Sequence, residues 1–194
     1  MANSDESLIR RFKNGDEESF KELVKRYQAR IYSIVFAMMG DKNDADDICQ
    51  EIFVKLYRSL YQFRGKSKFF TWLYRLTVNT CINAQNGRKR KLQTISLSHP
   101  VGESEQSLVE FIEQDGENCS IDILKNKELG MKINSAIDCL SDDLKEVFIL
   151  REIEDLSYRE LAKILQCSEG TIKSRLFRAR DRLKEKLLPY INNS

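Results

Sequence analysis

Residues that break regular structure are scarce in this sequence: 194 residues contain two prolines and eight glycines. Long apolar runs are also missing, and no stretch approaches the roughly 18 residues that a membrane-spanning helix needs. The first twelve residues are polar and charged, without the apolar centre of a secretion signal. With 41% hydrophobic and 32% charged residues, the sequence predicts a cytoplasmic protein of one or two small domains.

Residues that usually hold metals or perform covalent chemistry are few and scattered. His99 is the single histidine, and the five cysteines form no CxxC pair, so neither a zinc site nor a disulfide framework is expected. We interpret the cysteines as buried or incidental thiols in a reducing compartment. The sequence also has no glycine-rich nucleotide loop, catalytic Cys/His pair or carboxylate-metal cluster. It therefore predicts no metal, no cofactor, no small-molecule substrate and no enzymatic activity.

Charge is distributed in three blocks, although the net charge is only +2. Residues 1–91 hold 18 Lys and Arg against 11 Asp and Glu, residues 92–130 hold 2 against 8, and residues 131–194 hold 12 against 11. The acidic block is rich in polar residues and loses helical spacing. We expect two domains, 1–91 and 127–194, joined by a flexible acidic linker over 92–126, with separate partners for separate parts.

Apolar residues elsewhere recur at helical spacing. The spacing predicts one helix across Phe20–Met38, a second over about Asp44–Leu60 and a third from Phe69 toward Arg88. Helical spacing returns at Leu129, and three more short helices are expected after it. Because no convincing alternating strand pattern occurs, the sequence predicts an all-α fold.

The clearest motif is a helix-turn-helix over residues 156–176. Ser157 and Glu160 are spaced as a capping box, which fixes a helix start. A tight turn follows at Gln166, and Ser168 can cap the second helix. Such a turn often has glycine, and a left-handed backbone at Gln166 would cost about 1 kcal/mol. The second helix is expected to bury Ile172, Leu176, Ala179 and Leu183.

The second helix is expected to turn an acid-free basic face outward, made of Thr171, Lys173, Ser174, Arg175 and Arg178. Small polar residues at a helix start, with cations further along, suit the major groove of duplex DNA: the first turn approaches base edges and the cations reach phosphates. The alternative is a generic helical hairpin with a solvated charged face. Capping, turn and charge segregation agree with one another, which favours DNA binding.

A second candidate interface lies in the acid-free stretch 52–102, which holds ten Lys and Arg and eight of the 18 aromatic residues. Cations interleaved with rings suit single-stranded nucleic acid, because bases stack on rings and phosphates meet positive charge. For Trp72 and Phe53 we favour a core position. The loop 63–68, with its glycine, serine and cations, is the better candidate for binding.

Just before this stretch, the segment Asp44–Phe53 opens a helix with acids. Acids near a helix start interact favourably with the helix dipole, which accounts for Asp44 and Asp46. The dipole accounts less well for Gln50 and Glu51, which lie further along the helix. An acidic face beside a basic one predicts a protein partner distinct from the nucleic acid.

Together these motifs resemble the extracytoplasmic-function (group 4) sigma factors of the sigma-70 family. The resemblance rests on DAxDxxQExF at 44–53, FRG at 63–65 leading to FTWLYR at 70–75, and the helix-turn-helix ending in GTxKSRLxRAR at 170–180. It covers nearly the whole chain except the linker. It implies a sigma-2-like helical bundle and a sigma-4-like helix-turn-helix domain, which bind RNA polymerase core and direct it to promoters.

The resemblance implies three sets of site residues. The first docks on the clamp helices of the polymerase largest subunit: Asp44, Asp47, Gln50, Glu51 and Phe53. The second captures an unstacked base of the single-stranded minus-ten element in a loop pocket: Phe63, Arg64, Lys66, Ser67, Lys68, Phe70, Thr71, Trp72, Arg75, Asn79 and Asn83. The third reads the duplex minus-thirty-five element: Ser168, Glu169, Gly170, Thr171, Lys173, Ser174, Arg175 and Arg178.

The resemblance also implies an anti-sigma factor as a partner, often membrane-bound, and a linker that occupies a basic channel of polymerase until RNA displaces it.

From the residues alone, two other classes of protein stay open. An ordinary helix-turn-helix regulator would bind duplex DNA unaided, and it accounts for residues 141–186 but leaves the acid-free aromatic stretch unexplained. A protein-interaction adaptor would give no DNA footprint.

Overall fold

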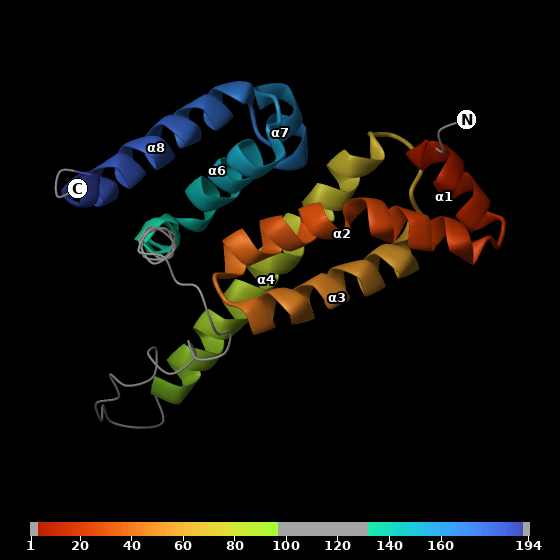
Figure 1. Cartoon of the computed structure of the whole chain (residues 1–194), viewed down its shortest axis with the longest axis horizontal. Helices are drawn as coiled ribbons and strands as arrows, with labels where there is room; N and C mark the ends of the chain where they lie inside the picture. The colour runs from red at the N-terminus through yellow and green to blue at the C-terminus, as the bar shows by residue number, and fades with distance from the viewer. Residues whose placement is uncertain (1–3, 97–131, 192–194) are drawn as a thin grey trace, which may run out of the picture.

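The computed structural model describes residues 4–96 and 132–191, and these ranges contain helices joined by turns and no β-strand. The predicted all-α fold is therefore confirmed. Most of the predicted linker, 97–126, lies outside the described residues, while α4 continues five residues past the expected domain end at 91. Residues 132–138 are also helical. The other helices are α1 (Asp5–Lys13), α2 (Glu17–Met39), α3 (Lys42–Leu60), α4 (Phe69–Ser96), α6 (Asp142–Glu154), α7 (Tyr158–Ile164) and α8 (Glu169–Ile191) (Figure 1).

Helix α1 is not predicted by the apolar pattern, because only three apolar side chains mark it: Leu8, Ile9 and Phe12. All three are buried. The hydroxyl of Ser4 starts the helix by accepting the Ser7 N–H at 3.2 Å. The ring of Phe12 lies against two rings at the end of α3, with centroids 5.3 Å from Tyr57 and 4.8 Å from Tyr61. This packing holds α1 beside the place where the loop to α4 begins.

Helix α2 is central to the molecule, since it packs against α1, α3, α4 and α6. It ends where Gly40 adopts a left-handed φ of 78° and its N–H donates to the Phe36 carbonyl oxygen at 2.9 Å. Asp41 then starts α3 by accepting the Asp44 N–H at 3.0 Å. The short turn reverses the chain and sets α3 against α2.

The helix-turn-helix of α7 and α8 forms as the sequence predicts. The Ser157 hydroxyl accepts the Glu160 N–H at 3.3 Å, and the Glu160 carboxylate accepts the Ser157 N–H at 3.0 Å, which completes the capping box. The Ser168 hydroxyl accepts the Thr171 N–H at 3.0 Å and caps α8. The expected stripe of α8 is buried in full: Ile172, Leu176, Ala179 and Leu183.

Gln166 occupies a left-handed position in this turn, with a φ of 54°. A side chain there costs roughly 1–2 kcal/mol, which glycine avoids, although glycine also makes the unfolded chain more flexible. We expect Gln166→Gly to raise the free energy of unfolding by about 0.5–1 kcal/mol, measured by urea denaturation. Gln166→Ala keeps the Cβ atom and should give no gain, so an equal gain in both variants would contradict backbone strain at this position.

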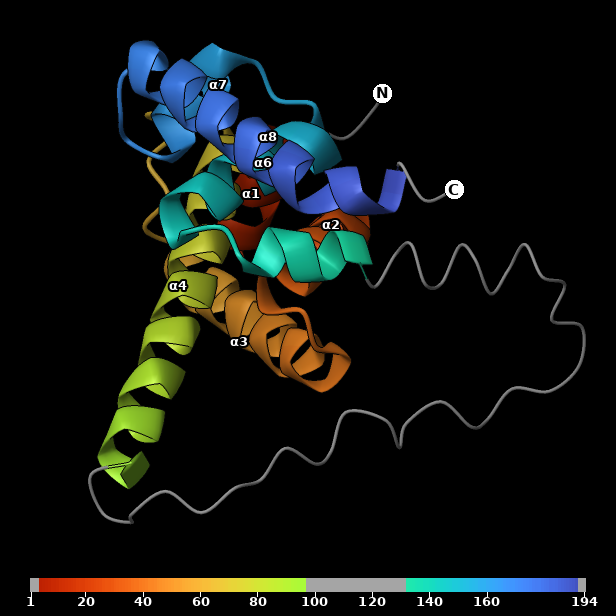
Figure 2. The ribbon, with the colours of Figure 1, turned by 90° about the vertical axis from the view of Figure 1, so that its left-hand side faces the viewer.

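The amino-terminal and carboxyl-terminal helices pack on each other. Helix α6 lies against α2 and helix α7 against α4 (Figure 2). The main cluster of buried apolar residues runs through both halves. Helices α2 and α4 therefore carry the face on which the helix-turn-helix half rests. Within the described ranges, no helix is both long enough and apolar enough to cross a bilayer.

Candidate nucleic-acid interface

The first turns of α8 present most of the predicted duplex-reading residues at the surface. The Thr171 hydroxyl is half-buried and lies 2.9 Å from that of Ser168. The Arg178 guanidinium folds along the helix, with Nε donating to the Ser174 carbonyl oxygen at 3.3 Å. Polar groups at the helix start, followed by cations, leave this surface able to approach base edges and phosphates. The exposed members are Ser168, Glu169, Gly170, Lys173, Ser174 and Arg178.

Contrary to the sequence prediction, Arg175 does not point outward from α8. Its side chain is 23% exposed and turns back to α6. There Nη1 lies 3.3 Å from the Glu146 carboxylate, and Nε lies 3.4 Å from the Asp143 carboxylate. The prediction placed Arg175 outward because residues 171–180 have no acid, and sequence spacing does not show acids contributed by another helix. Arg175 braces α8 against α6 in this structure.

Glu146 is a buried acid, and burial raises the pKa of its carboxyl to about 7, although the Arg175 cation opposes the rise. The folded pKa lies above the ordinary 4.5. The stabilising contribution of protonated Glu146 is therefore complete below about pH 4.5 and is lost as the pH rises through 7. We expect the free energy of unfolding of the wild type, relative to that of Glu146→Gln, to fall by about 2–3 kcal/mol between about pH 4.5 and pH 7. Urea unfolding at several pH values measures this difference, and parallel pH profiles of the two proteins would contradict it.

Phe177 is a surface residue of α8 that the sequence analysis missed. Its side chain is 73% exposed, an unusual position for a phenylalanine. It lies one turn after Lys173 and Ser174 and therefore on the same face of the helix. An apolar ring among polar groups on such a face can contact the methyl group of thymine. The available signal was the position of Phe177 outside the buried stripe, next to Leu176.

The loop between α3 and α4 exposes its cations as predicted. The Phe63 ring is half-buried, with centroids 5.9 Å from Phe69 and 5.3 Å from Trp72. Trp72 is half-buried and packs against the core, which agrees with its predicted core position. Gly65 has a left-handed φ of 69°, which favours glycine. The exposed loop residues are Arg64, Gly65, Lys66, Ser67 and Lys68.

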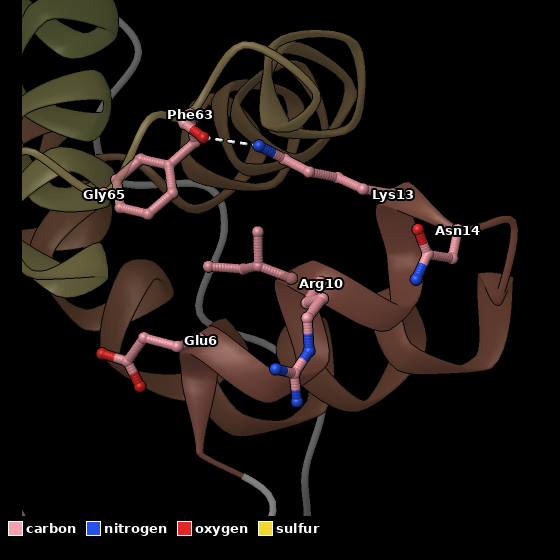
Figure 3. Close-up of a pocket in the computed structure, with 7 residues that line it drawn as sticks. Glu6, Arg10, Lys13, Asn14, Phe63 and Gly65 are labelled. Carbon is pink, nitrogen blue, oxygen red and sulfur yellow. Dashed lines mark hydrogen bonds between the residues drawn. The ribbon is translucent and has the colours of Figure 1, made fainter.

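A cavity of about 320 Å³ lies between α1 and this loop (Figure 3). The Lys13 ammonium donates to the Phe63 carbonyl oxygen at 2.5 Å and so ties the loop to α1. The cations of α1 are missed by the sequence analysis, because α1 itself is not predicted and Lys13 stands 50 residues before Phe63. The lining residues are Glu6, Ile9, Arg10, Lys13, Asn14, Phe63 and Gly65.

Helix α4 places the remaining minus-ten candidates in different environments. Asn79 and Asn83 are exposed one turn apart. Phe70 is half-buried against the core. Thr71 is 3% exposed, so its side chain contributes to packing and is not at the surface. The structure thus brings two of these four side chains to one exposed stripe of the helix.

Arg75 lies on the same stripe of α4 but is turned toward α7. Its Nε donates to the Ile164 carbonyl oxygen at 3.2 Å, and its Nη2 donates to the Lys163 carbonyl oxygen. No local sequence pattern predicts this contact, because the partners lie almost 90 residues away. In this arrangement the Arg75 side chain is engaged by the helix-turn-helix half.

The acidic face of α3 is exposed where the sequence predicts a protein partner. Asp47, Gln50 and Glu51 are all exposed. Val54 is 48% exposed and, from its spacing, continues the same face. Val54 was not predicted to be exposed, because an apolar residue in an amphipathic helix is first expected to be buried. These four residues form one stripe that no other part of the described molecule covers.

Two other members of the predicted polymerase-binding set lie apart from this stripe. Asp44 forms an ion pair with Arg88 of α4, so its charge is already partnered. The Phe53 ring is half-buried and packs on the core, as its apolar position suggested. Both residues therefore hold α3 in place and contribute less to its exposed surface.

Two of the four described cysteines are buried. Burial raises the pKa of the Cys49 thiol to about 11 and that of Cys81 to about 12, which keeps both protonated. Cys139 is exposed and Cys167 half-buried. Among the described residues, no group of three His, Cys, Asp or Glu side chains could hold a metal ion.

Comparisons with known proteins identify the family to which this chain belongs. Residues 23–91 match the model of sigma-70 region 2, and residues 130–183 match that of sigma-70 region 4. The chain is 38% identical over 191 residues to the ECF RNA polymerase sigma-E factor of Escherichia coli strain K12, covering 97% of this chain and 96% of the relative. It is 34% identical over 194 residues to the RNA polymerase sigma-H factor of Pseudomonas aeruginosa, covering 98% and 97%.

A solved structure also shares the fold. The sigma factor RpoE of Bartonella quintana, crystallised with the anti-sigma factor NepR, superimposes with a TM-score of 0.65 at 25% identity, covering 88% of this chain and 97% of that one. The chain belongs to the sigma-70 family, in its extracytoplasmic-function group. It is therefore a transcription initiation factor and not an enzyme, and the ordinary regulator and adaptor readings are set aside.

Proposed function

We propose that three separate surfaces divide the work of promoter-specific initiation. The stripe Asp47, Gln50, Glu51 and Val54 of α3 docks on the clamp helices of the polymerase largest subunit. The 63–68 loop with α4 recognises the minus-ten element, and the start of α8 reads the minus-thirty-five element. The observation that carries this assignment is the segregation of charge within one domain: Asp47 and Glu51 are exposed on α3, and the charged residues that the 63–68 loop exposes are all cations.

Recognition of the minus-thirty-five element rests on the exposed polar start of α8. In the major groove, Glu169 can accept from the amino group of cytosine, Lys173 can donate to guanine, and Phe177 can contact a thymine methyl. Arg178 lies further along the helix and can reach a phosphate. Arg175, held by Glu146 and Asp143, positions the helix in this proposal.

Recognition of the minus-ten element rests on the cavity beside the loop. A base leaving the stack costs a few kcal/mol, which stacking and pocket contacts offset. The cavity between α1 and the loop supplies the pocket, with Phe63 at its edge and Arg10 and Lys13 as cations. The exposed Lys66 and Lys68 can hold the phosphates that flank the unstacked base.

The loop cations give a test of this assignment. We expect Lys66→Ala with Lys68→Ala to lower initiation by the reconstituted polymerase about tenfold on a duplex promoter. On a template already melted at the minus-ten element the loss should shrink to less than about threefold, because the unstacking cost is removed. Run-off transcription measures both values. The matched control is Lys21→Ala with Lys25→Ala, which removes two exposed cations of α2. An equal loss of initiation by the Lys66 and Lys68 variant on both templates would count against a role of these cations in promoter melting.

We also propose domain boundaries at 1–91, 92–126 and 127–194, supported by the limits of the family matches at 91 and 130.

Regulation and localisation belong to the same proposal. The related structure solved with an anti-sigma factor supports an inhibitor of this kind for this chain, which would act in the cytoplasm or hold the protein at a membrane. The acidic linker would occupy a basic polymerase channel. A neutral linker that left core affinity and promoter escape unchanged would argue against that role.

A further inference from the structure

Glu146 of α6 is a buried acid whose charge the proposed function does not use. Helix α6 packs against α8 (Figure 1), and there a Glu146 carboxylate oxygen lies 3.3 Å from Nη1 of Arg175. The Glu146 side chain is 11% exposed. A second acid, Asp143, stands one turn earlier on α6, 3.4 Å from the Arg175 Nε, and is 45% exposed. One cation is thus held between a buried acid and a solvated one.

The charges that act on Glu146 come from α6 and α8. Burial raises the pKa of the Glu146 carboxyl to about 7, the Arg175 cation of α8 opposes the rise, and Asp143 and Asp142 of α6 add to it. Helices α2 and α7 also pack on α6, and within the described residues neither contributes a charged group to this balance. Lys145 points toward α2, where its ammonium donates at 2.7 Å to a carbonyl oxygen in the last turn. Glu146 therefore changes its charge near neutral pH, directly beside Arg175.

Arg175 stands next to the surface that reads the minus-thirty-five element. It lies one turn after Thr171 and about one turn before Arg178, so these three residues follow one line along α8. Arg178 is exposed, and in the proposed function it reaches a phosphate. A guanidinium offers a phosphate the same paired donors that it offers a carboxylate. Duplex phosphates at this surface therefore compete with the two acids of α6 for Arg175.

From this arrangement we propose that Arg175 is a conditional phosphate ligand, which is released to the DNA backbone when Glu146 takes up a proton. With Glu146 ionised, Arg175 braces α8 against α6 and gives the DNA no contact. With Glu146 neutral, the acid that remains is the half-exposed Asp143, and an ion pair near solvent contributes little.

The approach of DNA acts on Glu146 in the same direction. Phosphates brought close to a buried acid favour its neutral form, and so does the departure of Arg175. The pKa of Glu146 is therefore higher in the DNA complex than in the free protein, and promoter binding takes up a proton. By reciprocity, promoter affinity rises as the pH falls through the range between these two pKa values.

The test compares the wild type with Glu146→Gln, each reconstituted with polymerase core on a duplex promoter. Their affinity ratio cancels the titration of polymerase itself. We expect the ratio of wild-type to variant affinity to rise about fivefold as the pH falls from about 8 to about 6, as follows from a rise of about one unit in the pKa of Glu146 on binding. At about pH 8 the slope of log affinity against log salt should be steeper in the variant by about 0.5–1, because a phosphate contact is added.

Further measurements separate Arg175 and Glu146 from other groups. Arg175→Met combined with Glu146→Gln should return the salt slope to the wild-type value. The wild type alone should have a steeper salt slope at about pH 6 than at about pH 8, which requires no variant to fold. Glu152→Gln, which removes an exposed acid of the same helix, and His99→Asn, which removes the single histidine, should keep the wild-type pH dependence.

A constant affinity ratio across this pH range would overturn the proton-controlled release. A ratio that changes while the salt slopes stay equal would overturn the phosphate contact of Arg175. This inference rests on the proposed function, since it adds a contact to the duplex-reading surface. Failure of that function would appear elsewhere, because Lys173→Ala with Arg178→Ala would then leave promoter binding intact at every pH.

Discussion

Alanine at both Gln50 and Glu51 is expected to weaken binding to RNA polymerase core about 30-fold, close to 2 kcal/mol. Both side chains are exposed on α3, and neither packs on the core, so the change removes contacts with the partner and leaves the fold in place. Glu51 pairs with Lys55 on its own helix at 2.6 Å, and an exposed pair of this kind contributes little to stability. Competition with a labelled sigma factor for core polymerase measures the affinity.

The matched control for this double variant is Glu18→Ala with Gln28→Ala, which removes the same two residue types from exposed positions of α2. The control is expected to change core affinity by less than about twofold. If the Gln50 and Glu51 variant bound core polymerase as tightly as the wild type, α3 would not be the docking surface. Thermal unfolding of both variants separates a loss of binding from a loss of structure.

The second large effect is expected at the start of α8. Lys173→Ala with Arg178→Ala should lower the affinity of holoenzyme for a duplex promoter by about 2–4 kcal/mol, because each cation loses a base or phosphate contact. The slope of log affinity against log salt should fall by about 1–2, since one or two phosphate contacts are lost. Filter binding over a range of salt concentrations gives both quantities.

Lys184→Ala with Lys186→Ala provides the control, because it removes two exposed cations from the far end of the same helix. Its salt slope should match that of the wild type. If both double variants weakened binding equally, nonspecific charge would account for the effect and α8 would not enter the groove at its start. Arg175→Ala is unsuitable as a first test, because it would also remove the cation beside buried Glu146.

Elements whose signals are local could be predicted from the sequence. The capping box of Ser157 and Glu160, the cap at Ser168 and the buried stripe of α8 depend on residues three or four positions apart, and all form as expected. The exposed cations of the 63–68 loop were also predictable, because glycine, serine and charge mark exposed backbone.

Features that depend on distant partners could not be predicted. The acids that hold Arg175 lie on α6, 29 or more residues earlier. The acceptors of Arg75 are nearly 90 residues away, and the Lys145 acceptor is 107 residues away. Helix α1 was missed for a different reason: three apolar side chains in a polar segment give too short a pattern, yet they place Lys13 beside the loop.

Run-off transcription measures directly whether this chain acts as a sigma factor. Purified bacterial core polymerase is combined with a fragmented genomic DNA library, with and without this protein. Sigma function predicts discrete new start sites that share two upstream elements at fixed spacings, and these sites should be lost with the Gln50 and Glu51 variant. No new transcripts, together with strong unaided binding of the wild-type chain to duplex DNA, would contradict it.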